Sequence, residues 1–255
     1  MQLIDSHCHL DDDRLDEQRD DIIAEAFDRG VGRMIVPATT ANRWEKIQRL
    51  CASHKGLYPA YGLHPMFIEQ HLPRHLAELD EWLQREAPVA VGECGLDFFA
   101  SRADEKWQKQ LFQEQLHLAN QHRLPTIVHV RKAMDEVISL LRRQPHHGGV
   151  IHSFAGSEQQ ARQLYDLGFK LGIAATVGFE RARKLRAVVA AMPLDALLLE
   201  SDAPDQPGAG HRGELNRPGY VVEHLQTMAE LRQMDVVELA AALTRNTEAL
   251  FNLSA

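Results

Sequence analysis

Short runs of apolar residues alternate with longer amphipathic stretches along the whole chain of 255 residues. The short runs are bounded by polar or turn-forming residues, which is typical of buried strands, whereas the longer stretches repeat their apolar positions at helical spacing. The pattern predicts eight strands, over residues 2–7, 33–37, 58–63, 89–93, 126–130, 150–153, 169–173 and 196–200. It predicts helices over residues 16–29, 44–53, 76–86, 103–122, 133–143, 158–167, 181–191, 218–232 and 235–250.

Strands that alternate with helices in this way predict an α/β fold with a parallel sheet. Eight such units in 255 residues match the usual size of a single (β/α)₈ TIM barrel, in which catalytic residues follow the carboxyl ends of the strands. A doubly wound open sheet is the alternative that the same pattern allows. No linker or low-complexity tract divides the chain, so we expect one domain over residues 1–255.

One long segment has neither the strand-like nor the helical spacing of apolar residues. Residues 203–219 (APDQPGAGHRGELNRPG) are rich in turn formers and lie between the last predicted strand and its helix. Long irregular loops in compact domains are usually functional, and this one follows the carboxyl end of a strand. We therefore expect it to border an active site.

Composition and charge narrow the class of protein. The chain has no apolar window long enough to span a membrane, and residues 1–5 lack the features of a signal peptide, so we expect a cytoplasmic protein without membrane association. Three cysteines, Cys8, Cys51 and Cys94, match no zinc ribbon and favour a reducing compartment. A net charge of −8 argues against a long phosphate-binding groove. Nothing indicates an obligatory protein partner.

The 14 histidines are the unusual feature of the composition, and several of them stand where predicted strands end. His7 and His9 have the i, i+2 spacing that puts two side chains on one face of a strand. Five of the eight predicted strands end in a possible metal ligand, and the full set is His7, His9, Glu93, His129, His152 and Asp202. In a barrel these ends meet at one rim, so the sequence predicts a metal site there.

The types of ligand restrict the metal. Four imidazoles and two carboxylates suit Zn²⁺, Mn²⁺ or Mg²⁺, and alternation turns Cys8 and Cys94 to the opposite face as packing residues. Six ligands exceed what one tetrahedral ion needs, so we expect two divalent ions bridged by a carboxylate. Such a centre would be locally positive within an acidic protein and could receive a phosphodiester.

Six ordered motifs give a resemblance to a known family. They are residues 4–10 (IDSHCHL), 62–65 (GLHP), 91–97 (VGECGLD), 129–131 (HVR), 152–156 (HSFAG) and 200–204 (ESDAP), and together they resemble the TatD family of metal-dependent hydrolases. The resemblance implies an amidohydrolase-like TIM barrel with deoxyribonuclease or related phosphodiesterase activity. It also implies that His7, His9, Glu93 and Asp202 hold one ion, and that Glu93, His129 and His152 hold the other.

The leading hypothesis is a deoxyribonuclease, or another phosphodiesterase, in which Glu93 and Asp202 are catalytic and Asp202 takes the proton of the attacking water. Its partner would be DNA or another phosphodiester. Hydrolysis of a small-molecule amide or lactone is one alternative. Such relatives often carry a carboxylated lysine where this chain has Glu93. Deacylation of aminoacyl-tRNA is another alternative.

Two further residues are candidates for substrate binding. Arg131 follows His129 on the same face and could clamp a phosphate, although a salt bridge would also explain it. His64 could contact a phosphate oxygen or make a structural hydrogen bond. Asp97 is a candidate for orienting a ligand, whereas His71, His75, His146 and His147 are interpreted as solvated.

Four positions depart from the pattern of the family that the chain resembles. The chain has Ser153 for a usual Cys, Ser201 for a usual Thr, Lys132 for a common Asp, and residues 215–218 (LNRP) for Arg-Asn-Glu-Pro. These departures place the chain in a divergent branch whose substrate preference could differ.

Overall fold

The computed structural model describes residues 2–253 and contains one sheet of eight parallel strands. The strands follow one another in sequence order, which a doubly wound sheet does not do, so the predicted (β/α)₈ barrel is confirmed. They are β1 (Leu3–Asp5), β2 (Val31–Pro37), β3 (Leu57–Tyr61), β4 (Ala90–Asp97), β5 (Thr126–Arg131), β6 (Gly149–Ile151), β7 (Phe169–Ile173) and β8 (Leu197–Leu199).

Two backbone hydrogen bonds join the first and last strands. The N–H of Ser6 donates to the carbonyl of Leu199 at 3.0 Å, and the N–H of Asp202 donates to the carbonyl of His7 at 2.9 Å. Both bonds lie just beyond the carboxyl ends of β1 and β8. They bring the segment that contains His7 directly beside the segment that contains Asp202.

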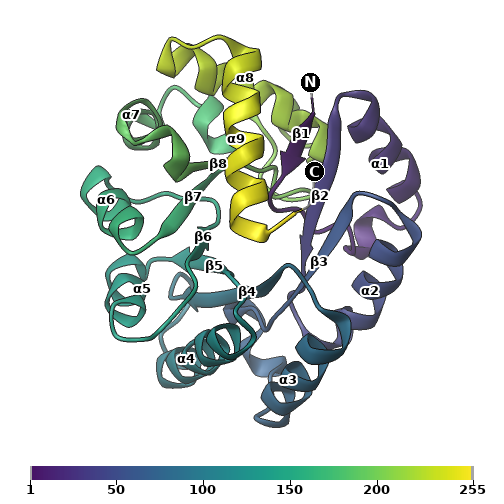
Figure 1. The fold of residues 1–255 in the computed structure, drawn as a ribbon, viewed down its shortest axis with the longest axis vertical. Helices are drawn as coiled ribbons and strands as arrows, with labels where there is room; N and C mark the ends of the chain where they lie inside the picture. The colour runs from purple at the N-terminus through teal and green to yellow at the C-terminus, as the bar shows by residue number, and fades with distance from the viewer. Residues whose placement is uncertain (1, 254–255) are drawn as a thin grey trace.

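Nine helices surround or cover the barrel in the described part of the chain (Figure 1). They are α1 (Arg19–Asp28), α2 (Trp44–Ser53), α3 (Arg74–Glu86), α4 (Glu105–His122), α5 (Met134–Leu141), α6 (Glu158–Asp166), α7 (Arg183–Ala191), α8 (Val221–Arg232) and α9 (Val236–Phe251). Every predicted strand and helix is present, with ends that differ by a few residues. The prediction of one domain over residues 1–255 stays a prediction, and its first residue and last two lie outside the described residues.

Short 3-10 helices were not predicted. Residues 203–219 contain η6 (Ala209–His211) and reach into η7 (Pro218–Tyr220). The others are η1 (Asp13–Leu15), η2 (Ala41–Arg43), η3 (Pro65–Gln70), η4 (Ala175–Gly178) and η5 (Leu194–Ala196). Three or four residues are too few to show a helical period, which explains why the pattern missed most of them.

The interior of the barrel is closed at its amino-terminal end by α9. Small and branched side chains from seven of the strands form a buried cluster with Phe251 and Leu253: Ile4, Ile35, Ala60, Ala90, Ile127, Val150 and Leu198. Figure 1 shows α9 lying across this end of the barrel, and α9 contacts both β1 and β8. The apolar plug leaves the opposite, carboxyl-terminal end for polar side chains.

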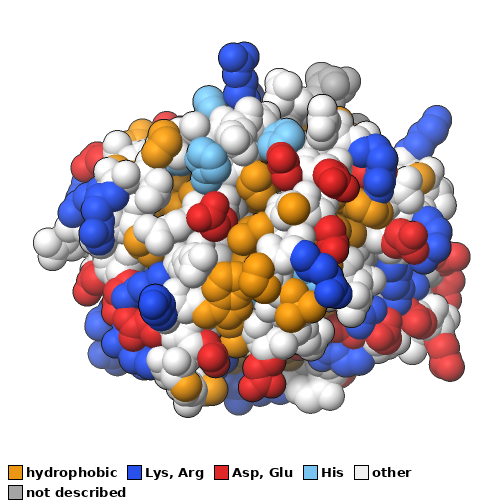
Figure 2. All heavy atoms as spheres, turned by 90° about the horizontal axis from the view of Figure 1, so that it is seen from below, with side chains coloured by type: hydrophobic (Ala, Val, Ile, Leu, Met, Phe, Trp, Pro, Cys, Tyr) orange, Lys and Arg blue, Asp and Glu red, His pale blue; other side chains and the backbone are white. Residues whose placement is uncertain are grey.

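The outer surface mixes both signs of charge. On the face shown in Figure 2, which lies over α3 and α4, apolar side chains reach the surface among scattered basic and acidic ones. Met66, Leu72 and Phe99 are large apolar side chains exposed after β3 and β4. Between residues 2 and 253, no helix has the length and hydropathy needed to cross a bilayer.

Replacing Phe251 tests the role of the plug. Phe251 is 2% exposed, and Phe251→Ala should lower the free energy of unfolding by about 3–5 kcal/mol because it leaves a cavity beneath the barrel interior. Val237→Ala is the matched control on the same helix, since Val237 is 59% exposed and its loss should cost less than about 0.5 kcal/mol. Urea unfolding of the two variants measures both values, and equal effects would contradict the assignment.

Candidate metal centre

All six predicted ligands meet at the carboxyl-terminal end of the barrel. His7 and His9 follow β1, Glu93 lies in β4, His129 lies in β5, and two further ligands follow β6 and β8, namely His152 and Asp202. β1 ends at Asp5, so the histidine pair belongs to the segment after the strand. The Nε2 atoms of this pair are still only 3.2 Å apart, as the i, i+2 spacing predicts.

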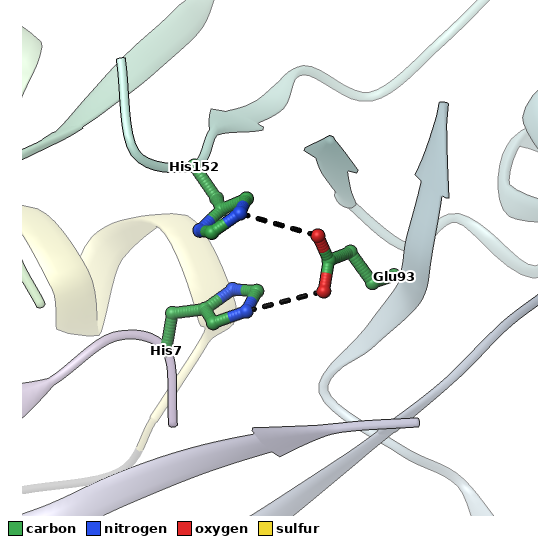
Figure 3. Close-up of side chains that lie close together, drawn as sticks. All are labelled: His7, Glu93 and His152. Atoms are coloured by element: carbon green, nitrogen blue, oxygen red, sulfur yellow. Dashed lines mark ion pairs between the residues drawn. The ribbon is translucent and has the colours of Figure 1, made fainter. Parts of the chain in front are cut away.

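The Glu93 carboxylate stands at the centre of the group. Its Oε2 lies 3.2 Å from Nε2 of His7, and its Oε1 lies 3.2 Å from Nε2 of His152 (Figure 3). The side chain is 1% exposed, and Oε2 has no hydrogen-bond partner among the described residues. A buried carboxylate oxygen without a donor fits a position where a cation binds.

Four ligand atoms form the first candidate ion site. They are Nε2 of His7, Nε2 of His9, Oε2 of Glu93 and Oδ1 of Asp202. The two Nε2 atoms lie 3.2 Å apart. Nε2 of His7 lies 3.2 Å from the Glu93 oxygen and 3.6 Å from the Asp202 oxygen. The corresponding distances from Nε2 of His9 are 3.4 and 3.7 Å. Metal–ligand bonds of about 2.0–2.2 Å in a tetrahedral site place ligand atoms about 3.3–3.6 Å apart. The five separations that involve the two imidazoles are therefore close to those of a tetrahedral site, and His7, His9 and Asp202 offer ligand atoms that all lie within 4.8 Å of one another.

The other oxygen of Glu93 defines a second group. Oε1 lies 3.1 Å from Nδ1 of His129 and 3.2 Å from Nε2 of His152. The groups whose ligand atoms all lie within 4.8 Å of one another combine Glu93 with His64 and His129 on one side, and with His7 and His152 on the other. Glu93 thus faces imidazole nitrogens with each of its two oxygens.

His64 also approaches Glu93, but its proton lies on the wrong nitrogen for a ligand. Nδ1 of His64 accepts a hydrogen bond from the N–H of Met66 at 3.0 Å, where it caps η3. In the neutral ring the proton is then on Nε2, which lies 3.0 Å from Oε1 of Glu93. Burial lowers the pKa of His64 to about 4, so this ring is a neutral hydrogen-bond donor.

Two other imidazoles have their second nitrogen held by an acceptor. Nε2 of His129 lies 3.0 Å from Oδ2 of Asp97, and Nδ1 of His9 lies 3.2 Å from the carbonyl of Pro37. Such contacts fix the tautomer and the ring orientation of a metal ligand. Asp97 therefore contacts a predicted ligand, His129, as expected of a residue that orients one.

The electrostatics of the group centre on the Glu93 charge. Burial alone would raise the pKa of this carboxyl, but the imidazoles of His64, His152 and His7 hold it well below its usual range. Burial opposes the charged form of His152 as well, yet Glu93 and Asp202 raise the pKa of that imidazole to about 10. A metal ion would have to displace such protons, so metal affinity should fall at low pH.

The carboxylate of Asp202 is buried, and one of its two oxygens is held by a hydrogen bond. Burial raises the pKa of its carboxyl, while His152 and His9 act in the opposite direction. Oδ1 faces His7 and His9, whereas Oδ2 accepts a hydrogen bond from the side-chain amide of Gln206. The sequence analysis did not single out Gln206, because an amide in a loop follows no pattern.

All of the predicted ligands except His7 line a cavity of about 700 Å³ that opens at this end of the barrel. Its wall also carries three guanidinium groups. Arg14 is paired with Asp12 and Asp205, and Arg43 is paired with Asp13.

The third guanidinium, Arg131, has a different neighbour. Its Cζ lies 3.6 Å from the centre of the exposed Phe99 ring. No carboxylate of residues 2–253 lies within ion-pair distance of Arg131, which disfavours the salt-bridge interpretation.

Half of the strained backbone positions lie at the carboxyl-terminal end of the barrel. Eight described residues other than glycine have positive φ, and four of them end helices: Ala87, Arg123, Gln233 and Asn252. The other four follow strands at the carboxyl-terminal end: Lys132, Ser153, Asp202 and Gln206. Conformations of this kind persist where neighbouring contacts hold them and are common at functional sites.

The interpretation of two histidines as solvated was wrong. His71 is 4% exposed and His75 is 9% exposed. Nε2 of His71 lies 2.8 Å from the carbonyl of His64, and Nδ1 of His75 accepts from the N–H of Leu72. A polar local sequence hid the fact that both rings pack beside η3.

The other two histidines that were interpreted as solvated differ from each other, and the prediction for two of the cysteines is confirmed. His147 is exposed as expected, whereas His146 is half-buried against Phe169. Cys8 and Cys94 are buried and donate to backbone carbonyls, so they are packing residues as predicted.

Residues 203–219 border the cavity through Asp205 and Gln206. Asn216 ties this loop to the barrel, because its amide donates to the carbonyls of Ser201 at 2.7 Å and Asp205 at 2.9 Å. In the same loop, His211 stacks on Tyr220, and its ring nitrogens approach Glu223 and Glu214. The prediction that this loop lies at the site is supported by these contacts.

Comparison with known proteins agrees with the geometry. The family model described as TatD related DNase matches residues 4–252. A metal-dependent hydrolase of Escherichia coli K12, YjjV, is 40% identical over 99% of this chain and 98% of its own. A second such hydrolase, YabD of Bacillus subtilis, is 32% identical over 99% of this chain and 100% of its own.

Solved structures give the same relationship. The crystal structure of the YjjV protein of E. coli, a TatD homologue, superposes with a TM-score of 0.95 at 41% identity, covering 99% of this chain and 98% of the other. The chain is a metal-dependent hydrolase built on a (β/α)₈ barrel. It belongs to the TatD-related DNase family.

The environment of His211 predicts a pH-dependent contribution to stability. The hydrogen bond to Glu223 raises the pKa of His211, so the protonated ring favours the folded state. The contribution should be fully present below about pH 6.5 and be lost as the pH rises through the raised value. His211→Gln should lower Tm by about 1–3 °C at pH 6 and by less at pH 9.

Thermal unfolding across this pH range measures the effect. His117→Gln, which replaces an exposed histidine on α4, is the control and should show no such trend. A deficit in His211→Gln that stays constant with pH would assign the whole effect to the lost stacking on Tyr220.

Proposed function

We propose that this chain is a phosphodiesterase that cleaves DNA with two divalent ions, Zn²⁺, Mn²⁺ or Mg²⁺. The observation that carries the proposal is the Glu93 carboxylate, whose two oxygens face two different sets of imidazoles. Two ions against the carboxylates of Glu93 and Asp202 would leave a net charge of about +2, which suits an anionic substrate. The family name and Arg131, which has no ion-pair partner among residues 2–253, point the same way.

The residues present fit such ions. His7, His9, Glu93 and Asp202 would hold one, and Glu93, His129 and His152 would hold the other. Divalent ions bound there would act as Lewis acids, which make water more acidic and stabilise negative charge on a phosphoryl group. The orphaned Oε2 of Glu93 and the 3.2–3.7 Å spacing of the donor atoms support this assignment.

Individual side chains of the protein would then have separate roles in the reaction. Asp202 is the proposed base that takes the proton of the attacking water, and Gln206 holds one of its oxygens. Arg131 would bind a phosphate oxygen, because its guanidinium reaches the cavity and rests on the ring of Phe99. His64, with its proton on Nε2, would hold the Glu93 carboxylate in place through Oε1, which is the structural hydrogen bond that the sequence also allowed.

The proposal also covers the compartment. Cys8, Cys51 and Cys94 are free thiols, and three free thiols suit the cytoplasm, where the family's substrate class would be present. Amide or lactone hydrolysis and aminoacyl-tRNA deacylation stay as the competing activities, since a bridged two-ion site can serve each of them.

A substrate panel with controlled metal tests the function. Protein stripped with a chelator and reloaded with Zn²⁺, Mn²⁺ or Mg²⁺ should cleave single-stranded DNA and a chromogenic phosphodiester, and elemental analysis should find about two ions per chain. The stripped protein should be inactive, and reloading should restore the rate.

The same panel includes amides, lactones and an aminoacyl-tRNA. Faster hydrolysis of one of these than of every phosphodiester would replace the proposal with the corresponding alternative. Binding of no ion above background, in protein as purified and after metal soaking, would contradict the two-ion site itself.

Asp202→Asn separates proton transfer from metal binding. The amide keeps the size of the side chain but loses its charge and basicity, so kcat should fall by at least about 10²-fold. KM for the phosphodiester should change much less, because the base acts mainly in the transition state. Steady-state kinetics over a range of metal concentrations measures both parameters.

Excess metal gives the decisive comparison. If Asp202 served only as a ligand, saturating metal would restore much of the rate, whereas loss of a base is not rescued. Asp195→Asn is the matched control, since Asp195 lies at the opposite end of the same strand and contacts Tyr165. A near-normal kcat for Asp202→Asn at saturating metal would move the role of base to another group.

A further inference from the structure

We propose that Glu200 is a positioning residue that fixes the tautomer and the orientation of the His152 imidazole for metal binding. This residue follows β8 and precedes Ser201 and Asp202 in the chain. The inference rests on the metal centre proposed above but not on the identity of the substrate. It concerns a carboxylate that contacts no proposed ion and acts only through a ligand.

The His152 ring has one nitrogen engaged and one without a partner. Its Nε2 faces Oε1 of Glu93 at 3.2 Å, as Figure 3 shows. Its Nδ1 is buried, and no described residue forms a hydrogen bond with it. An imidazole that binds an ion through Nε2 carries its proton on Nδ1, and this N–H needs an acceptor.

Glu200 supplies the acceptor. Its Oε1 lies 3.5 Å from Nδ1 of His152, and the side chain is completely buried. A distance of 3.5 Å is longer than a well-formed hydrogen bond, but contacts of this kind in active sites tighten when a ligand binds. Within residues 2–253, Glu200 is the carboxylate that lies within ion-pair distance of this nitrogen.

The carboxylate is itself held by its neighbours. Oε1 accepts a hydrogen bond from the backbone N–H of Ser153, the residue after His152, and Oε2 faces the hydroxyl of Ser6 at 3.5 Å. Ser153 has a φ of 46°, and this strained backbone keeps its N–H directed at Glu200. One oxygen therefore contacts both the backbone and the imidazole of the same β6 terminus.

Gly172 on β7 makes room for this arrangement. A Cβ atom at position 172 would lie 2.1 Å from Oε2 of Glu200, and its φ is not in the positive region that favours glycine. Glycine is therefore needed for space and not for backbone conformation. Gly172 on β7 therefore leaves space for the carboxylate that follows the neighbouring strand, β8.

The other imidazoles of the centre show the same kind of support. His129 has Asp97 behind it at 3.0 Å, and His9 has the carbonyl of Pro37 at 3.2 Å. Glu200 would complete this set for His152. A purely structural brace between β6 and β8 is the competing explanation, because the contact with the Ser153 N–H alone would account for a buried carboxylate.

Glu200→Gln distinguishes the two explanations. The amide keeps the volume of the side chain but is a weaker acceptor, so the affinity for Zn²⁺ or Mn²⁺ should fall about 10–100-fold at the ion that His152 holds. Competition with a chelator and calorimetry measure the affinity and the number of ions. Gly172→Ala, which retains Glu200 but displaces its carboxylate, should lower the affinity in the same way.

Glu248→Gln is the matched control. Glu248 accepts a hydrogen bond from the guanidinium of Arg33, so its carboxylate joins α9 to β2 and contacts no ligand. The variant should lower the Tm of the stripped protein and leave the metal affinity within about twofold, as loss of a structural brace does. Equal losses of affinity in Glu248→Gln and Glu200→Gln would overturn the proposal.

A measurement on the wild-type protein decides the case if the variants do not fold. Nitrogen-15 NMR of the histidine rings in Zn²⁺-loaded protein should show the His152 proton on Nδ1 and the ion on Nε2, and the reverse tautomer would contradict the role. Wild-type protein that binds no ion would overturn both this inference and the proposed function. Protein that binds ions through His152 Nε2 but cleaves no phosphodiester would overturn the function alone.

Discussion

The carboxylate of Glu93, contacted by imidazoles on both of its oxygens, is the interaction on which the carboxyl-terminal end of this barrel depends. An isolated buried carboxylate is costly and normally becomes protonated. Here the surrounding imidazoles hold the pKa of Glu93 well below its usual range in spite of burial. The charge is kept because His7, His64, His129 and His152 arrive from four different strand ends.

The parallel barrel is what makes this convergence possible. Strands in sequence order place every carboxyl end at one rim, so residues as far apart as His7 and Asp202 become neighbours through the bonds that join β1 and β8. The polar rim stands at one end of an interior whose other end is filled by apolar side chains and the last turn of α9. Stability and chemistry are therefore located at opposite ends of the same strands.

The sequence predicts those features that have a period or a fixed position relative to a strand. Eight apolar runs with helices between them determined the barrel, and ligands such as Glu93 and His129 were found because each stands at the end of a run. His71 and His75 were misjudged, since a polar neighbourhood in the chain says little about what η3 brings against them.

Residues that act through other residues have no such signal. Gln206 and Glu200 reach the ligands Asp202 and His152 across sequence separations of four and 48 residues, the second of which only the fold can bridge. Gly172 appears in the sequence as one more strand residue. Its meaning depends on the side chain that occupies the space beside it on β8, and this relationship exists only in three dimensions.

Two of the positions that depart from the family pattern contact residues beside the ligands and are not ligands themselves. Ser201 donates its hydroxyl to Asp5 and Ser153 donates its hydroxyl to Gln206, while the ligand positions beside them, His152 and Asp202, are retained. A serine in place of cysteine at position 153 adds a stronger donor toward the amide that holds Asp202. Changes of this kind alter how firmly the ligands and the loop of residues 203–219 are held, and they leave the donor atoms themselves unchanged. Substitutions at such positions are therefore expected to affect the shape and rigidity of the cavity more than its metal chemistry.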